Sequence, residues 1–421
     1  MNNTSLVVKA GLDMSIYQER TLKPAIVLAT HTMGLGVIRA LGRMGVPVVA
    51  VYYDRHKDMG YVSKYVKHQV YVPHPEHAED EFLARLLELA PRFGGGLLLP
   101  VSDETLVTVS QHKEMLARHF IVACTEWAIT RQFIDKKYTY ALADAVGVAA
   151  PKTIVPQSLE EVEHYGKTVE YPCLVKPSQS HLFFARFGRK MVSVENLEQM
   201  LAICQQSAEA GLEVTLQEII PGDDAHVVNY NSYFWDGQPV VEFTAQHVRK
   251  APPEFGSPCV AVSKQIPEVL EPGRKILQAL GFYGYSCTEF KKDARDGIYK
   301  LMEVNGRHNL STLLAVNCGI NFPWLHYRHL VEGIVPEQTR FRDEFFWIDM
   351  ERDLPFIPQR IFKQGESLAQ ILAPYINPHV SAVYDSQDPK PFYKRYADFS
   401  KNALGRLFQH TRQVDQSRRL S

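Results

Sequence analysis

The sequence contains no apolar run that approaches the roughly 18 residues needed to span a bilayer. Residues 1–23 also lack the hydrophobic stretch of about 7–15 residues on which a signal peptide depends. Net charge is nearly absent, at −1 for 421 residues, so there is no general electrostatic case for binding nucleic acid. These absences predict a cytoplasmic protein with no nucleic-acid partner.

Cysteine is scarce, and no two cysteines form a CxxC pair. The six cysteines are scattered along the chain, and most lie in apolar, strand-like runs such as residues 171–175. Their spacing indicates neither a disulfide framework nor a metal site. We therefore expect buried, reduced thiols.

The chain does have enough apolar sequence, 45% of its 421 residues, for two or three domains. In its first part, short apolar runs alternate with helical patterns. Strands are expected at residues 25–29, 47–52 and 96–101, and helices at residues 34–43 and 80–89. This alternation predicts a doubly wound domain, with a parallel sheet covered on both faces.

The first expected turn carries a short glycine motif, Gly34 and Gly36. A dinucleotide-binding fingerprint needs a third glycine for close helix packing, but that position is Arg39. The motif therefore does not predict a dinucleotide site. A structural turn, or a substrate contact from Thr30 and His31 at the end of the first strand, fits better.

The rest of the chain is expected to form two α+β regions and a C-terminal extension. A helix over residues 127–146 opens the second region. The expected domains are residues 1–125, 126–215, 216–335 and 336–421. An apolar stripe at helical spacing lies in the basic C-terminal segment, at Phe392, Tyr396, Phe399, Ala403 and Leu407. This helix is expected either to pack on the body or to make peripheral contact with an anionic membrane or a partner.

An expected β-hairpin carries opposed acidic residues. Two β-prone runs flank residues 294–297, which form a strong turn signal. If residues 295–297 form the loop, with Gly297 in the left-handed conformation, then Glu289 faces Glu303 across the hairpin. Asn305, two residues further on, points to the same side. A two-residue turn would instead place Glu289 opposite Val304. Because like charges directly opposite are destabilising, the facing arrangement indicates a hard cation such as Mg²⁺, the alternative being a solvated acidic face.

Residues upstream of the hairpin suit the parts of a nucleotide. Lys176 ends an apolar strand and precedes a proline that keeps the backbone extended. Phosphates need ammonium or guanidinium groups, for which the candidates are Lys136, Lys176 and Lys190. Adenine needs backbone contacts from a linker strand, for which the candidates are Gln217, Glu218, Ile219 and Ile220. The turn that follows would bring Asp224 toward the ribose hydroxyls.

Five short motifs, in order and spacing, resemble those of the ATP-grasp superfamily, specifically its carboxylate–amine ligases, the group that includes D-aspartate ligase-like enzymes. The motifs are residues 135–137, 175–177, 217–224, 288–291 and 302–307. Each motif alone is weak, but five in order over residues 24–330 are specific. The resemblance implies an ATP-grasp fold of mixed α/β and α+β class. In this fold, two subdomains that follow the doubly wound N-terminal domain in the sequence bind ATP between them.

The resemblance also implies how ATP is held. Lys136 and Lys176 would bind the phosphates, Glu218 to Ile220 would form the adenine hinge, and Asp224 would bind the ribose. Many family members follow the second lysine with a glycine-rich loop that closes over the phosphates. Residues 178–190 contain a single glycine, so Lys190 and serine side chains would do the clamping instead.

By the same resemblance, the hairpin would hold Mg²⁺, as two ions and with Mn²⁺ able to substitute. The implied ligands are Glu289, Glu303 and Asn305. Arg307 would contact the reacting phosphate or acyl oxygen, and it would share the catalytic role with Lys176.

These groups suit phosphoryl transfer to a carboxylate. Its oxygen must attack the γ-phosphorus of ATP, and the like charges repel until metal and lysines neutralise the phosphates. The acyl phosphate would then react with an amine. The sequence thus predicts an ATP- and Mg²⁺-dependent ligase. It would join the carboxylate of a small molecule, expected to be an amino acid, to an amine. The alternatives are transfer to a thiol or hydroxyl, or a non-catalytic nucleotide-binding protein.

Three residues are candidates for the substrates. Arg249 begins a turn-rich loop and could hold a substrate carboxylate, the alternative being a solvated charge. Asp103 and Glu104 follow a parallel strand, where α/β sheets usually bind ligands, and could receive the amine. Ser102 or Asp103 would serve equally well as a helix N-cap.

Overall fold

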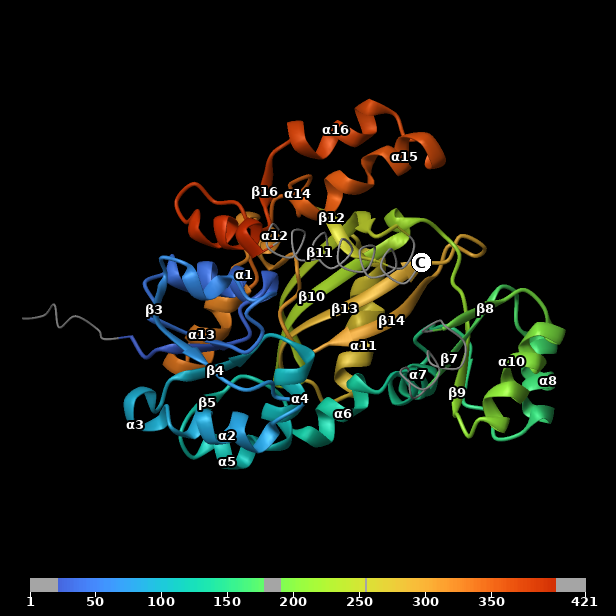
Figure 1. Ribbon diagram of the computed structural model, residues 1–421, viewed down its shortest axis with the longest axis horizontal. Coiled ribbons are helices and arrows are strands. Elements are labelled where there is room, and N and C mark those ends of the chain that lie inside the picture. Colours follow the sequence, from blue (N-terminus) through green and yellow to red (C-terminus); the bar gives the residue numbers. More distant parts are fainter. Residues whose placement is uncertain (1–21, 178–190, 254–255, 399–421) are drawn as a thin grey trace, which may run out of the picture.

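The computed structural model describes residues 22–177, 191–253 and 256–398 of the chain. Three sheets organise this part of the molecule, and they follow one another along the chain (Figure 1). No helix among the described residues is long and apolar enough to cross a membrane. All six cysteines are buried and free, as their spacing predicts.

The N-terminal part forms a parallel sheet with strand order β3-β2-β1-β4-β5. The strands are β1 (Ala25–Leu28), β2 (Val48–Tyr52), β3 (Val66–Tyr71), β4 (Leu97–Pro100) and β5 (Ile121–Val122). The helices are α1 (Thr32–Gly42), α2 (Glu79–Leu87), α3 (Ala90–Phe93), α4 (Asp103–Gln111) and α5 (Lys113–Ala117). The predicted doubly wound domain is confirmed.

Both faces of this sheet are buried, which explains why its strands are continuously apolar. Ile26 and Leu28 enter a hydrophobic cluster with Phe82 of α2 and residues of α4. Val27, between them, enters a second cluster with residues of α1 and with Tyr327 from far along the chain. Successive side chains of a strand point to opposite faces, so each face has its own covering layer.

The glycine motif after β1 is structural. A Cβ at Gly34 would lie 2.1 Å from the carbonyl oxygen of Ala29, so α1 begins too close to the strand end for any side chain. Arg39, where the dinucleotide fingerprint needs a glycine, is fully buried, and its Nε lies 3.0 Å from Oδ2 of Asp388. The first turn of the fold is therefore built for packing.

The predicted single helix over residues 127–146 is wrong. The structure has two helices, α6 (Trp127–Ile134) and α7 (Lys136–Ala145), separated by Asp135 in an extended conformation. The Asp135 side chain accepts a hydrogen bond from the backbone N–H of Lys137 and so caps α7. This break places Lys136 in the first turn of a new helix.

A small antiparallel sheet with order β6-β9-β7-β8 follows. Its strands are β6 (Thr153–Ile154), β7 (Cys173–Pro177), β8 (Val192–Val194) and β9 (Val214–Glu218). Helices α8 (Leu159–Thr168) and α10 (Leu197–Glu209) pack together against this sheet around a separate apolar cluster. In Figure 1 this subdomain lies at the end of the molecule opposite the N-terminal sheet.

The largest sheet lies between them, with order β14-β13-β10-β11-β12-β15-β16. Its strands are β10 (Val227–Trp235), β11 (Gln238–Ala251), β12 (Ser257–Ser263), β13 (Gly284–Lys292), β14 (Tyr299–Asn305), β15 (Phe346–Ile348) and β16 (His379–Ser381). Helix α11 (Leu270–Ala279) packs against β10 and β11, whereas α12 (Thr312–Asn317) and α13 (Phe322–Glu332) also contact α1 of the N-terminal domain. The last two strands come from the C-terminal extension, so the extension completes this sheet.

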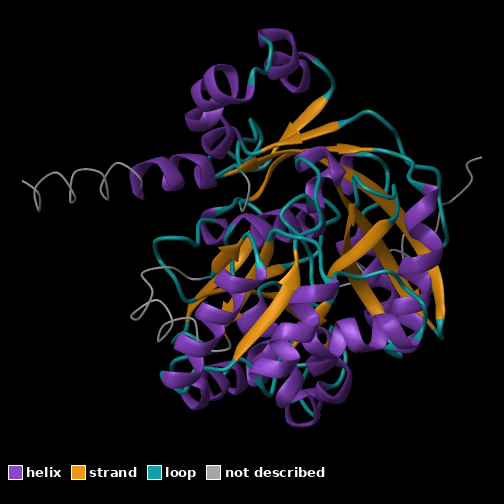
Figure 2. Ribbon diagram, turned by 90° about the vertical axis from the view of Figure 1, so that its right-hand side faces the viewer, coloured by secondary structure: helices purple, strands orange, loops and turns teal. Residues whose placement is uncertain are grey.

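The remaining elements of the extension lie together at one end of the molecule (Figures 1 and 2). They are α14 (Met350–Asp353), α15 (Ile357–Gln364) and α16 (Leu368–Ile376). After β16 the chain returns to the N-terminal sheet, where Asp388 accepts hydrogen bonds from Arg39 and from Ser63 Oγ at 2.7 Å. Residues 390–398 are helical, and Phe392 packs against the central core.

Candidate active site

The β13–β14 hairpin brings two carboxylates face to face. Phe290 pairs with Leu301, a register that alone would place Glu289 opposite Met302. A bulge at Met302 shifts the pairing by one residue, so Glu289 pairs with Glu303. The predicted facing pair is confirmed, although the bulge that produces it was not predicted.

The two carboxylates have different environments. Burial and the charge of Glu303 raise the pKa of Glu289 to about 7. Burial also favours the neutral form of Glu303, but the ammonium of Lys136 and a hydrogen bond from Asn305 lower its pKa. Lys136 Nζ lies 3.0 Å from Glu303 Oε2, and Asn305 Nδ2 donates to Oε1 at 3.0 Å. Among the described residues, a lysine or arginine directly contacts Glu303 but not Glu289.

This donor set fits a hard divalent cation. Glu289 and Glu303 offer carboxylate oxygens, and Asn305 donates to Glu303 through its nitrogen, so its carbonyl oxygen is available as a ligand. Burial and the charge of Glu303 raise the pKa of Glu289, and the charges of Lys250 and Lys136 offset this only in part. A cation bound by the two carboxylates would keep both of them ionised.

Lys176 extends from β7 toward the same region. Its ammonium donates a hydrogen bond to Gln217 Oε1, and Gln217 Nε2 donates to Thr153 Oγ1 at 3.0 Å, so a buried amide orients the lysine. Burial, with Lys136 nearby, lowers the pKa of Lys176 to about 8. The two lysines thus converge closely enough to repel each other. Lys190 lies outside the described residues.

The expected adenine hinge begins at the last residue of β9, Glu218, and continues into the loop after it. The Glu218 carboxylate is buried, receiving Arg295 Nη2 at 2.6 Å and the backbone N–H of Lys152 at 3.1 Å. The backbone N–H groups of Ile219 and Ile220 donate to no other described residue. The hinge is therefore held by the side chain of Glu218, and two backbone donors after it are available to a ligand.

Asp224 lies beyond the hinge, at the start of a short 3₁₀ turn, η3 (Asp224–His226). Its Oδ2 accepts from the backbone N–H of Lys250 at 2.9 Å and lies 3.9 Å from Arg360 Nη2. This contact joins the expected ribose acid to strand β11.

Arg307 joins the hairpin to the N-terminal domain. Its Nε and Nη2 donate to the two oxygens of Asp103 at 2.7 and 2.8 Å, a bidentate ion pair. Ser102 is the N-cap of α4, which leaves Asp103 free for this contact. Glu104 and His31 lie in the same electrostatic neighbourhood, since the charges of Glu104, Asp103 and Arg307 all act on the buried imidazole.

The structure contradicts the expectation that Arg249 holds a substrate carboxylate. Its side chain is buried in a bidentate ion pair with Asp353, at 2.6 and 2.8 Å, and Tyr375 donates to the same carboxylate at 2.7 Å. The next residue, Lys250, acts electrostatically on Glu289 instead. Two irregularities in β11, on either side of Arg249, break the alternation that the sequence suggests.

Buried polar atoms without partners lie beside the carboxylates, and nothing in the sequence singled them out. Asn229 pairs with Glu289 across β10–β13, and its Oδ1 has no hydrogen-bond partner among the described residues. Both ring nitrogens of His247 are also unpartnered there, with Nε2 3.9 Å from Glu289 Oε2. Buried polar groups normally have partners, so these atoms mark a surface for a ligand or water.

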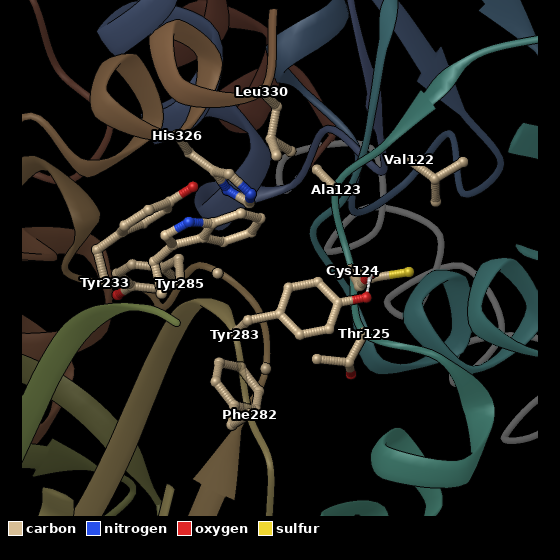
Figure 3. Close-up of a pocket in the computed structure, with 13 residues that line it drawn as sticks. Val122, Ala123, Cys124, Thr125, Tyr233, Phe282, Tyr283, Tyr285, His326 and Leu330 are labelled. Carbon is tan, nitrogen blue, oxygen red and sulfur yellow. Dashed lines mark hydrogen bonds between the residues drawn. The ribbon is translucent and has the colours of Figure 1, made fainter. Parts of the chain in front are cut away.

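A separate cavity lies between the N-terminal domain and the central region and is too small for a substrate. Figure 3 shows Tyr233, Phe282, Tyr283, Tyr285 and His326 around it, with residues 122–125 of the N-terminal domain on the other side. Its volume is about 20 Å³. That is room for about one water molecule, so the cavity is a packing feature between domains.

No family model matches the chain. Among sequence relatives, the D-aspartate ligase of Enterococcus faecium is 27% identical over 236 residues, covering 53% of this chain and 56% of the relative. The chain thus spans little more than half the length of that relative.

Among the solved structures that resemble this one are an amino acid ligase and a biotin carboxylase domain. The L-amino acid ligase of Bacillus licheniformis is 16% identical and covers 74% of each chain, with a TM-score of 0.56. The biotin carboxylase domain of the Hydrogenobacter thermophilus 2-oxoglutarate carboxylase, in complex with MgADP and bicarbonate, is 17% identical. It covers 77% of this chain and 73% of that one, with a TM-score of 0.59. At these identities the likeness shows a shared fold.

Proposed function

Because the chain has the ATP-grasp fold, we propose that it is an ATP- and Mg²⁺-dependent ligase. It would activate a carboxylate, that of an amino acid, as an acyl phosphate and join it to an amine as an amide. The observation that carries this proposal is the pair of opposed carboxylates, Glu289 and Glu303, with Lys136 and Lys176 converging beside it.

The nucleotide would lie between the small sheet and the central sheet. The backbone of Ile219 and Ile220 would contact the adenine, with Gln217 and Glu218 before them, and Asp224 would bind the ribose hydroxyls. Lys136, Lys176 and Lys190 would bind the phosphates. Mg²⁺ held by Glu289, Glu303 and Asn305 would supply charge neutralisation at the β- and γ-phosphates.

The reaction then follows from the charges. An oxygen of the substrate carboxylate attacks the γ-phosphorus, and ADP leaves. The ammonium of Lys176 and the guanidinium of Arg307 stabilise the negative charge that accumulates on the transferred phosphoryl and acyl oxygens. The substrate ammonium group first loses a proton, and the neutral amine then attacks the acyl carbon. The C–N bond forms, the C–O bond to phosphate breaks, phosphate leaves, and the nitrogen loses a second proton. Arg307 lies on the loop just after β14, the strand that carries Glu303 and Asn305.

The amine would approach from the N-terminal domain. Asp103 and Glu104 lie at the carboxyl end of β4, beside Arg307, and an ammonium group is complementary to this acidic pair. An amino acid as the carboxylate substrate is supported by a relative named D-aspartate ligase and by a structural neighbour named L-amino acid ligase.

ADP release over a panel of amino acids and small amines tests the proposal. A ligase releases ADP only when a productive acid and amine are both present, and mass spectrometry finds one amide per ADP. Release with hydroxamate trapping but no amide would assign a thiol or hydroxyl acceptor. No stimulation by any pair, with ADP binding intact, would assign a nucleotide-binding protein.

The affinity for ADP should depend on pH through Lys176. Burial lowers its pKa to about 8, so the nucleotide-free protein loses this charge as the pH rises through about 8, while bound phosphates restore it. The association constant should fall by up to about tenfold for each further unit of pH. Calorimetric titration with MgADP measures this. Lys176→Arg keeps its charge and should remove the decline; an unchanged decline in that variant would contradict the assignment.

Asp103→Asn should raise KM for the amine by about tenfold or more, because the loss of a charged hydrogen-bond acceptor costs roughly 1.5–3 kcal/mol. KM for ATP should change much less than KM for the amine, since Asp103 contacts Arg307 and none of the residues assigned to the adenine, the ribose or the metal. Steady-state kinetics with each substrate varied in turn gives the KM values for ATP, the carboxylate and the amine. The exposed Asp80→Asn on α2 is the matched control. Equal increases in all three KM values would show that Asp103 only supports Arg307.

A further inference from the structure

The loops after β1 and β4 start at the same edge of the N-terminal sheet. These two strands are parallel neighbours at the point where the strand order reverses, which is where α/β sheets usually bind ligands. Leu28 pairs with Pro100, and His31 and Asp103 each lie three residues beyond this pair. The topology therefore places His31 beside the expected amine site.

Arg307 bridges the two strand ends. Its Nη1 lies 3.4 Å from Sδ of Met33, two residues after His31, while its Nε and Nη2 donate to Asp103. The charges of Arg307, Glu104 and Asp103 all act on the imidazole of His31. The residue assigned to the acyl phosphate and the two assigned to the amine thus lie around one histidine.

The imidazole of His31 is available to accept a proton. It has no hydrogen-bond or salt-bridge partner among the residues that the structure describes, and it does not cap α1. His31 is partly exposed, so a substrate can reach the ring. Burial lowers the pKa of His31 from its usual 6.5, so at neutral pH the ring is neutral and has one unprotonated nitrogen.

The carboxylates near His31 would stabilise the imidazolium that forms when it takes up a proton. Asp58 is buried, and its oxygens accept three backbone N–H groups at 2.6, 3.1 and 2.9 Å, which fixes its position. Against the effect of burial, the charges of Asp58, Glu104 and Asp103 raise the pKa of His31, whereas that of Arg307 lowers it. A neutral imidazole beside fixed negative charge is suited to proton transfer near neutral pH.

We propose that His31 is the general base that removes a proton from the substrate ammonium group. This inference rests on the proposed ligase function. An N–H bond of the ammonium breaks, its proton passes to the unprotonated ring nitrogen, and the freed electron pair attacks the acyl carbon. The C–N bond forms and the C–O bond to phosphate breaks. The second proton passes from the nitrogen to the departing phosphate, and the imidazolium returns its proton to solvent.

Hydroxylamine separates this role from the rest of the reaction. It is largely unprotonated at neutral pH, so it attacks an acyl phosphate without a base. In His31→Gln, amide formation with the amine found productive in the substrate panel should fall by roughly 10²–10⁴-fold, the usual contribution of a general base. Hydroxamate formation with hydroxylamine should stay close to the wild-type rate, which also shows that the variant is folded. His56→Gln, an exposed histidine in the loop after β2, is the matched control and should leave both rates unchanged.

The pH profile of kcat/KM for the amine distinguishes a base from a positioning residue. The wild type deprotonates bound ammonium, so its value should change little around neutral pH. Without a base, only amine that arrives unprotonated can react, so the value for His31→Gln should rise by about tenfold per unit of pH below the pKa of the amine.

Three results would overturn the proposal. Amide formation by His31→Gln at the wild-type rate would assign the proton transfer to another group, such as Glu104. Equal losses of amide and hydroxamate formation, with the wild-type pH profile retained, would assign His31 a structural role. Wild-type protein that releases ADP with no amine, whether or not it does so with hydroxylamine, would refute the ligase function itself and this role with it.

Discussion

Glu303→Gln is expected to abolish ATP turnover, with kcat reduced by roughly 10²–10³-fold or more. Glu303 is the ionised member of the opposed pair, in contact with both Lys136 and Asn305. Glutamine has nearly the same shape but cannot neutralise a divalent cation, so Mg²⁺ and the phosphates it accompanies lose their principal protein charge. ADP release at saturating substrates measures the effect.

The interpretation needs a folded variant and a matched control. Glu271→Gln changes an exposed glutamate on α11, paired with Lys275, and should leave turnover unchanged. Circular dichroism and the thermal unfolding midpoint, measured without Mg²⁺, check that the Glu303 variant is folded. Lys176→Ala should cause a comparable loss. Phosphate release close to the wild-type rate in either active-site variant would show that the site lies elsewhere.

Arg249→Ala should lower the free energy of unfolding by about 3–5 kcal/mol. The substitution leaves Asp353 as a buried, unpaired carboxylate, and breaking a buried ion pair from one side costs about this much. Attachment of α16 should weaken as well, because Arg249 also binds two of its backbone carbonyls. Urea unfolding followed by circular dichroism gives the free energy.

A double substitution distinguishes a structural role from a substrate role. Arg249→Met with Asp353→Leu removes both charges and should recover most of the lost stability. If Arg249 is structural, this double variant also retains the wild-type KM for the carboxylate substrate. A raised KM in a fully stable double variant would restore Arg249 as a substrate ligand.

The hairpin pairs the two glutamates that the sequence predicted to face each other, but through a different loop and register. The expected left-handed glycine is present, with Gly297 at φ +75°. The loop nevertheless closes by a backbone hydrogen bond from Asp293 to Ile298, which sets the register one residue away from the one expected. The bulge at Met302 then restores the pairing of Glu289 with Glu303. A bulge has no fixed residue signature, because it depends on how the strand must bend against its neighbours.

The strands and contacts of the extension after residue 335 could not be predicted from the sequence for a different reason. Strands β15 and β16 have three residues each, too short for a periodic pattern. They are strands because β15 pairs with the edge of β12, and β16 then pairs with β15. Asp388 is likewise an ordinary loop residue in the sequence. Its burial against Arg39 follows from the return of the chain to the N-terminal sheet.

The sequence by itself determined the local parts of this protein. Apolar alternation predicted the doubly wound sheet, and the resemblance of five short motifs to the ATP-grasp superfamily predicted that fold. Each of these signals lies in residues that are close together in the chain. Only the tertiary structure decided which charges meet. It paired Arg307 with Asp103 and withdrew Arg249 into contact with Asp353, across separations of 204 and 104 residues. A buried charged side chain must be paired with an opposite charge, because burial of an unpaired charge is costly. Which residue becomes its partner depends on how distant parts of the chain pack together.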